Sequence, residues 1–204
     1  MKKALLMALI FGLGFMGLCF AQETKSLLID DFEGPINCGP NGTVDFGAGG
    51  GSTLEVVAAQ DLQHLGRQSL KVTYNAVPGG YIWIARGYGL DAQNAGWLVK
   101  PEDINWDKYQ SISFYMYGSN SQASLAFDIK DNGGEIWRFT IQDDFKGWKE
   151  IACPFNQFLV RNDWQPDSAI KNVNLDFPLK SYQFEPMPPA QGTFYFDEVE
   201  LIEK

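Results

Sequence analysis

Short segments in which apolar and polar residues alternate recur along the chain, and helical periodicity is nearly absent. A period of two places successive side chains on opposite faces of a strand, so the pattern predicts half-buried antiparallel strands. These strands are expected at Leu27–Phe32, Thr53–Ala58, Ser69–Asn75, Tyr81–Arg86, Ser111–Tyr117, Ser124–Lys130, Glu135–Gln142, Trp148–Pro154, Val173–Phe177 and Thr193–Ile202. The Gly-rich tract Gly47–Gly51 is expected to be a loop between two of them. About ten strands without an internal linker predict an all-β fold, a single antiparallel β-sandwich or jelly roll.

Two of the expected strands carry a different set of large side chains on each face. The first set is Tyr81, Trp83, Tyr115 and Tyr117, and the second set is Ile82, Ile84, Phe114 and Met116. If the second set marks the interior of the sandwich, the first set lies on an outer, concave face, where aromatic rings can stack on successive sugar rings. The alternative is that the aromatic residues fill the core while the second set faces a helix or loop.

The same parity assigns the residues of two further strands. Asp128 and Arg138 fall on the polar sides of their strands, where they can contribute contacts to a cleft. Trp137 and Phe139 alternate with Arg138 and are assigned to the core, and Trp148 is assigned to the core as well.

Residues 1–21 have the organisation of a secretory signal peptide. Two lysines precede the apolar run Ala4–Leu18, and a short segment ending in Ala21 follows it. We expect cleavage after Ala21, which leaves residues 22–204 as a single domain that is secreted or periplasmic. No other apolar stretch approaches the roughly 18 residues needed to cross a bilayer, so no membrane span is expected.

The composition is acidic. The formal net charge of −9 becomes −11 once the two lysines of the expected signal peptide are removed. Nucleic acid and anionic lipid are poor partners for such a surface, whereas a neutral polysaccharide is compatible with it.

Two cysteines follow the expected signal peptide, and export permits a disulfide between them. Cys153 alternates with Ile151, which predicts that it faces the core, whereas Cys38 lies in a loop-like Asn-Cys-Gly-Pro segment. A disulfide and a buried free thiol therefore both stay open.

A loop with the chemistry needed to bind a sugar follows the expected strand Trp148–Pro154. Arg161, Asp163 and Trp164 lie within four residues of one another there. Sugars present C–H faces that stack on aromatic rings, and hydroxyl groups that accept from Arg and donate to carboxylates. The simpler alternatives are a Trp that plugs the core and a surface Arg–Asp pair worth about 0–1 kcal/mol.

Five sequence pieces occur in a characteristic order. They are LIDDFEG at 28–34, GY at 80–81, ISF at 112–114, GWK at 147–149 leading to PF at 154–155, and FDEV at 196–199. Together they resemble the family 11 carbohydrate-binding modules, calcium-containing β-jelly rolls that bind β-glucan chains in a cleft on one sheet. A broader group of galactose-binding-like sandwiches shares the opening and closing pieces.

The resemblance implies roles for particular residues. The Arg161–Trp164 loop matches three ligand-binding positions of the family, with Trp164 in place of a Tyr, and Tyr81 matches a second stacking position. The family's aromatic residue after the opening piece has no counterpart, and its His and Tyr on the penultimate strand align with Asn174 and Phe177. The implied function is binding of β-glucan or cellulose-like chains, with the preferred linkage left open.

Acidic residues also gather near the expected ends of the sandwich. Asp31 and Glu33 lie near the first expected strand and Asp197 lies on the last, and a sandwich brings its ends together. Hard oxygen ligands from separate segments suit Ca²⁺, and the resemblance implies a structural calcium there. The alternative is that these carboxylates are solvated strand ends.

No catalytic machinery is evident. A glycosidase needs two carboxylates flanking the scissile bond, and the Glu-x-Asp-x-x-Glu pattern of jelly-roll glucanases is broken because Tyr195 takes the place of its first Glu. The single histidine, His64, has no evident partner and is interpreted as a solvated loop residue. The sequence therefore predicts a secreted, non-catalytic binder, with which a separate glycoside hydrolase is compatible as a partner. The alternatives are a structural or assembly protein of the cell envelope and an unrecognised glycoside hydrolase.

Overall fold

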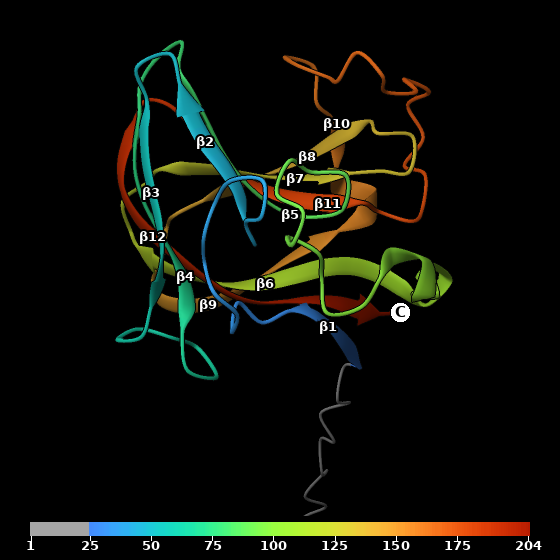
Figure 1. The fold of residues 1–204 in the computed structure, drawn as a ribbon, viewed down its shortest axis with the longest axis horizontal. Coiled ribbons are helices and arrows are strands. Elements are labelled where there is room, and N and C mark those ends of the chain that lie inside the picture. The colour runs from blue at the N-terminus through green and yellow to red at the C-terminus, as the bar shows by residue number, and fades with distance from the viewer. Residues whose placement is uncertain (1–24) are drawn as a thin grey trace, which may run out of the picture.

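Two antiparallel β-sheets packed face to face form the fold of residues 25–204, the part of the chain that this computed structural model describes (Figure 1). The predicted signal peptide lies outside the described residues. In order across sheet A lie β3 (Thr53–Ala59), β4 (Ser69–Ala76), β12 (Ala190–Glu203), β6 (Tyr109–Ser119) and β9 (Lys146–Pro154), with β1 (Ser26–Asp30) also paired to β12. In order across sheet B lie β10 (Leu159–Val160), β8 (Ile136–Gln142), β7 (Ser124–Lys130), β11 (Ser181–Pro186), β5 (Tyr81–Gly87) and β2 (Asp45–Gly49). The predicted all-β sandwich is confirmed.

Apolar side chains from both sheets meet in one core between them. The residues predicted to point inward, Ile82, Ile84, Phe114 and Met116, are buried. Phe184 of β11 and Phe196 of β12 stack across the sheets with ring centroids 3.9 Å apart and an angle of 6° between their planes. Burying each such side chain contributes roughly 1.5–3 kcal/mol, so the alternating strands are held mainly by this layer.

A polar contact also crosses the core and joins the two sheets. Asp30, at the end of β1 in sheet A, is fully buried. It accepts hydrogen bonds from Arg86 Nε and Nη2 of β5 at 2.7 and 2.8 Å, and from Tyr182 Oη of β11 at 2.7 Å. Because a buried carboxylate is costly unless it is paired, this arrangement fixes β1 to the inner side of sheet B.

One predicted strand and one predicted loop were wrong, and three strands, β2, β10 and β11, were missed. Val173–Phe177 is not a strand, because Val173 has a positive φ of 61° and its side chain is largely exposed. The penultimate strand is instead β11, in which Tyr182 and Phe184 point inward. The expected loop Gly47–Gly51 begins within β2, a short edge strand that pairs with β5.

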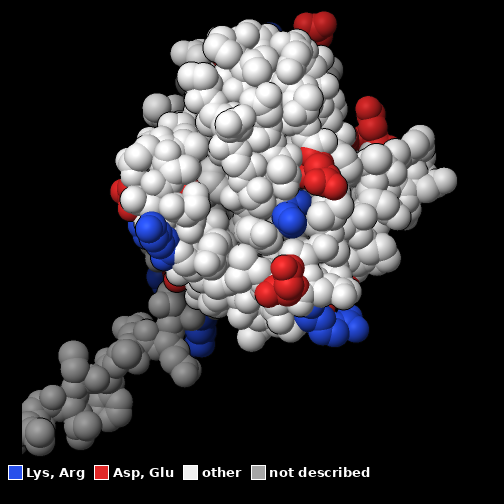
Figure 2. All heavy atoms as spheres, turned by 90° about the vertical axis from the view of Figure 1, so that its left-hand side faces the viewer, with Lys and Arg blue, Asp and Glu red and all other residues white. Residues whose placement is uncertain are grey.

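The remaining described elements are short 3₁₀ helices, η1 (Pro101–Asp103), η2 (Trp106–Lys108) and η3 (Phe155–Gln157). None of the helices in residues 25–204 has the length and apolar character to cross a membrane. On the side of the molecule where β3 and β12 lie, Lys, Arg, Asp and Glu side chains are scattered among uncharged residues (Figure 2).

The two cysteines that the structure describes are not bonded to each other. Cys38 is exposed in the loop before β2, and Cys153 is buried on β9, as its alternation with Ile151 predicts. Burial raises the pKa of the Cys153 thiol, which keeps it protonated and unreactive. Of the two alternatives, the structure therefore shows the buried free thiol.

Candidate functional site

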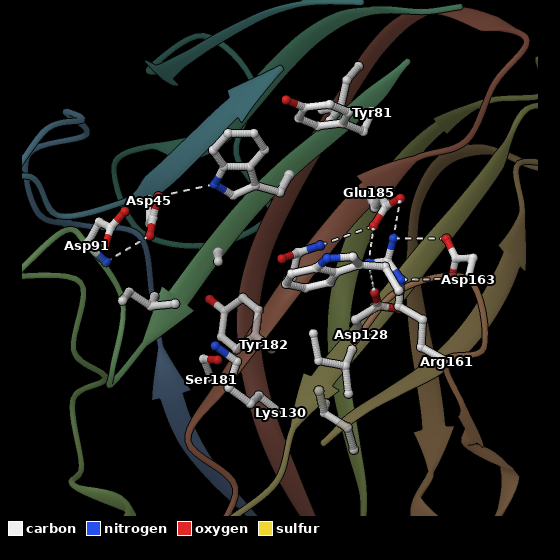
Figure 3. A pocket seen from close by; sticks show the side chains of 18 of the residues that line it. Asp45, Tyr81, Asp91, Asp128, Lys130, Arg161, Asp163, Ser181, Tyr182 and Glu185 are labelled. Atoms are coloured by element: carbon white, nitrogen blue, oxygen red, sulfur yellow. Dashed lines mark hydrogen bonds and ion pairs between the residues drawn. The ribbon is translucent and has the colours of Figure 1, made fainter. Parts of the chain in front are cut away.

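A pocket of about 650 Å³ opens on the outer face of sheet B, and we call it the cleft. Its walls come from β5 on one side and from the loop after β10 on the other, with β7 and β11 between them (Figure 3). Six of the predicted binding residues line it. They are Tyr81, Trp83, Asp128, Arg161, Asp163 and Trp164.

Two aromatic side chains of β5 form the first wall. Tyr81 and Trp83 lie two residues apart, so both point outward from sheet B, and their rings stack with centroids 5.9 Å apart and 23° between their planes. Tyr81 is 56% exposed. Trp83 donates from Nε1 to Asp45 Oδ1 at 3.1 Å, and Asp45 Oδ2 accepts the backbone N–H of Asp91 at 3.0 Å. These contacts hold the wall in place from the side of β2.

Two arginines and two buried carboxylates form the base of the second wall. Arg138 donates to both oxygens of Asp128 at 2.8 and 2.9 Å and to Glu185 Oε2 at 2.8 Å. Arg161 donates from Nη1 to Asp128 Oδ2 at 3.1 Å and to Glu185 Oε2 at 2.8 Å. Arg138 does not line the cleft itself but fixes two residues that do, so this predicted residue has a supporting position.

The electrostatics of this network differ between its two edges. Burial raises the pKa of Glu185, and the neighbouring arginines oppose that rise. At the exposed edge, Arg161 donates to both oxygens of Asp163 at 2.9 and 3.1 Å, and this hydrogen bonding lowers the pKa of Asp163. Asp163 is therefore ionised at neutral pH and can accept hydrogen bonds from sugar hydroxyl groups.

The loop that carries Trp164 is tied to the edge of β8. Gln165 accepts the N–H of Ile136 at 2.8 Å and donates to the carbonyl oxygens of Ile136 and Arg161, both at 2.8 Å. Trp164 itself is 56% exposed, and Arg161 Cζ lies 5.7 Å from its ring centroid. The Trp is thus presented at the surface by a fixed backbone, and the alternative that it plugs the core is wrong.

Several cleft residues were not predicted from the sequence. Glu185 and Gln183 line the cleft from β11, where Gln183 donates to Glu185 at 3.1 Å. Asp45, Asp91 and Lys130 line it as well. Recognition of residues 181–186 as a strand would have placed Gln183 and Glu185 on its outer face, since Tyr182 and Phe184 alternate with them.

Tyr115 and Tyr117 do not reach the cleft. Their strand, β6, belongs to sheet A, so their outward-facing side chains lie on the opposite side of the sandwich. Tyr115 stacks on His64 with ring centroids 3.6 Å apart, and Tyr117 contacts Trp148 edge to face at 5.6 Å. The prediction that these tyrosines face outward is confirmed, but the prediction that they share a face with Tyr81 is wrong.

The same surface corrects two other expectations. His64 is packed against Tyr115 and bonded to Glu198, so it is not simply a solvated loop residue. Trp148 lies half-buried on the outer side of sheet A beside Tyr117, because its pairing with that residue in the β6–β9 ladder puts both side chains on one face. Trp148 is therefore not a core residue, whereas Trp137 is buried and Phe139 packs against the core as predicted.

Two of the three predicted calcium ligands face one loop. Glu33 accepts the backbone N–H groups of Arg67 and Gln68 at 2.7 and 3.2 Å. Asp197 accepts those of His64 and Leu65 at 2.9 and 3.2 Å. Carboxylates from both ends of the described chain therefore converge on the turn that connects β3 to β4.

The third predicted ligand stands apart from that pair. Asp31 accepts the N–H of Glu33 at 3.0 Å, within its own turn. Within residues 25–204, no three His, Cys, Asp or Glu side chains are grouped so that they could hold a metal. Both oxygens of Glu33 and of Asp197 already accept N–H groups, so a calcium ion there would have to share them with these donors. It would need backbone carbonyl oxygens or water as its other ligands, which Ca²⁺ accepts.

A β-sandwich with an aromatic-walled cleft on the outer face of one sheet defines a carbohydrate-binding type of domain. The chain belongs to the carbohydrate-binding domains of family 11, whose family model matches residues 21–204. It is 28% identical over 183 residues to endoglucanase H of Acetivibrio thermocellus, a match that covers 86% of this chain and 18% of the relative. It is 23% identical over 158 residues to a mannan endo-1,4-β-mannosidase of Bifidobacterium adolescentis, covering 78% of this chain and 14% of that enzyme. The chain thus spans less than a fifth of the length of either relative.

A solved structure shares the fold. It is the family 11 carbohydrate-binding module from Clostridium thermocellum in complex with a β-1,3-1,4-mixed-linked tetrasaccharide, which is 22% identical to this chain. The two superpose with a TM-score of 0.65 over 89% of this chain and 98% of that one.

Proposed function

We propose that this chain binds β-glucan chains in the cleft without cleaving them. The observation that carries the proposal is the pairing of two walls, Tyr81 and Trp83 on one side and Trp164 with Arg161 and Asp163 on the other. The mixed-linked glucan bound by the Clostridium thermocellum module supports the same ligand class. We further propose that the chain acts outside the cytoplasm, secreted or periplasmic, where a separate glycoside hydrolase can share its polysaccharide.

The binding mechanism follows from the two walls. The C–H faces of glucose rings stack on Tyr81, Trp83 and Trp164, because the π-face of an aromatic ring is electron-rich. The Asp163 carboxylate, whose side chain is 55% exposed, accepts hydrogen bonds from the equatorial hydroxyl groups between the stacked rings. Arg161, whose side chain is only 10% exposed, holds this carboxylate in place. Since the network of Arg138, Asp128 and Glu185 beneath is already formed, little side-chain ordering opposes binding.

Four of the five carboxylates that line the cleft are bonded to neighbouring side chains, which disfavours hydrolysis. Asp128 and Glu185 are both bonded to Arg138 and Arg161, and Asp45 is bonded to Trp83. A glycosidase needs one carboxyl group free to donate a proton and a second free to act as base or nucleophile. We therefore propose a binding role for these groups and not a catalytic one.

Affinity electrophoresis tests the proposal. Residues 22–204 are run through native gels that contain barley β-glucan, xyloglucan or hydroxyethyl cellulose, and we expect retardation in at least one of them. Tyr81→Ala is expected to reduce that retardation, because it removes one stacking ring worth about 1–3 kcal/mol by analogy with stacked nucleic-acid bases.

The matched control is Tyr117→Ala, which removes the same kind of side chain from the opposite face. It is expected to migrate like the wild-type protein in every gel. Absence of retardation by all three glucans would contradict the proposed function, and equal weakening by both variants would contradict its placement in the cleft.

Structural calcium at Glu33 and Asp197 is a second proposal, with thermal melting as its test. Burial raises the pKa of Asp197 from 3.8 to about 6. A carboxyl group with a raised pKa favours folding while protonated, so this contribution is present below about pH 4 and lost as the pH rises through 6. Because calcium binds the ionised form, a saturating concentration is expected to raise the melting temperature of EDTA-treated protein by about 5–10 °C at pH 7, and by less at pH 5.

Asp197→Asn is the control for this experiment, since the amide keeps the shape and loses the charge. It is expected to abolish most of the calcium-dependent shift. A wild-type melting temperature that is the same in EDTA and in calcium at pH 7 would disprove the calcium proposal.

A further inference from the structure

The short edge strand β2 carries two glycines directly beside the aromatic wall of the cleft. In the antiparallel ladder between β2 and β5, Gly47 pairs with Trp83 and Gly49 pairs with Tyr81. Residues paired in this way have their side chains on the same face of a sheet. A side chain at Gly47 or Gly49 would therefore project into the layer of space that the two rings occupy.

The rings fill that space already. A Cβ atom added at Gly47 would lie 2.3 and 2.5 Å from two ring carbons of Trp83, and one added at Gly49 would lie 2.3 Å from Cζ and 2.4 Å from Oη of Tyr81. Both aromatic side chains thus extend sideways from β5 across the backbone of β2. Any other amino acid at either position would push the outer part of a ring away from β2.

The opposite end of the Trp83 ring system is held by a separate contact. The Asp45 carboxylate, on the same strand as both glycines, accepts from Trp83 Nε1 and also from the N–H of Asp91. Trp83 can reach Asp45 because its side chain lies over Gly47. The orientation of the indole therefore depends on two features of β2. One is the lack of a side chain at Gly47, and the other is the hydrogen bond that Asp45 accepts from Trp83 Nε1.

We propose that Gly47 and Gly49 are positioning residues that set the aromatic wall of the cleft, so that Trp83 and Tyr81 present their faces to two successive sugars. The 5.9 Å between the ring centroids is comparable with the length of one pyranose in a β-linked chain. Because the two planes differ by only 23°, one extended chain can contact both rings. This inference rests on the proposed function and specifies how one wall of the cleft is built.

A double-mutant cycle between Gly47 and Trp83 tests the inference. Gly47→Ala is expected to weaken binding of the retarding glucan about 5-fold or more, the lower range for loss of one stacked ring. In a Trp83→Ala background the same substitution is expected to leave the affinity unchanged, since no indole remains to be displaced. Gly34→Ala is the matched control, because a Cβ there has no atom within 4 Å, and it is expected to bind like the wild-type protein.

A signal that needs no ligand separates this inference from the proposed function. The indole N–H resonance of Trp83 is assigned by its loss in Trp83→Ala, and Gly47→Ala is expected to shift it and to speed its exchange with solvent as the bond to Asp45 weakens. If the wild-type protein binds no glucan but the resonance shifts, the proposed function fails and the positioning role stands. An unchanged resonance, or an equal loss of affinity in both backgrounds of the cycle, overturns the positioning role.

Discussion

Replacement of Arg138 by methionine is expected to lower the free energy of unfolding by about 3–5 kcal/mol, the usual cost of removing one partner from a buried ion pair. The Arg138 side chain is 15% exposed and that of Asp128 only 2%, so the pair is buried. Without Arg138, Asp128 loses the two hydrogen bonds from Nε and Nη2 and keeps the one from Arg161. Methionine keeps the apolar stem of the side chain and removes only the charge and the donors. Urea unfolding of the two proteins measures the difference.

Lys149→Met is the control for this prediction, because the pair that Lys149 forms with Asp144 is 3.9 Å long and exposed on both sides. Its expected cost is about 0–1 kcal/mol. An Arg138→Met protein as stable as Lys149→Met would show that the network beneath the cleft does not stabilise the fold.

Replacement of Trp164 by alanine is expected to reduce glucan affinity about 5- to 150-fold, which corresponds to the loss of about 1–3 kcal/mol of stacking. The side chain is exposed and its loop is tied to β8 through Gln165, so the fold should tolerate the change. Isothermal titration with the glucan that retards the protein measures the affinity, and a melting curve checks the fold.

The comparison for Trp164 is Ile170→Ala. Ile170 is an exposed apolar residue on the same long loop, and it does not line the cleft. It is expected to leave affinity unchanged. Equal affinities of Trp164→Ala and the wild-type protein would contradict the proposed stacking of a sugar on Trp164.

Most of the fold could be predicted from alternation because inward and outward positions differ strongly in polarity. β6 shows why this works: Ile112, Phe114 and Met116 are all fully buried, and Tyr115 between them is not. Alternation did not predict β2, because its glycines have low strand propensity and are typical of a turn. The structure gives them another reason to be present, since they leave room for the rings of Trp83 and Tyr81.

The candidate site could be predicted only in part, because periodicity gives the face of a strand and not the sheet to which the strand belongs. Tyr81 and Tyr115 have equivalent patterns around them, yet β5 lies in sheet B and β6 in sheet A. Strand order depends on long-range pairing, which no local window contains. The three residues of the Arg161–Trp164 loop were found because they lie together in the sequence. Glu185, which contacts Arg161 from 24 positions further on, was not found.

The pairing of β1 with β12 has a practical consequence for the use of this domain as a probe. Ser26 pairs with Ile202, and Glu203 donates to the carbonyl oxygen of Lys25, so both described ends of the chain lie together on sheet A, whereas the cleft opens on sheet B. A fluorescent protein fused after Lys204, or a surface tether attached there, would therefore leave the cleft facing away from its point of attachment. The domain can be displayed in a known orientation, with the cleft toward the sample.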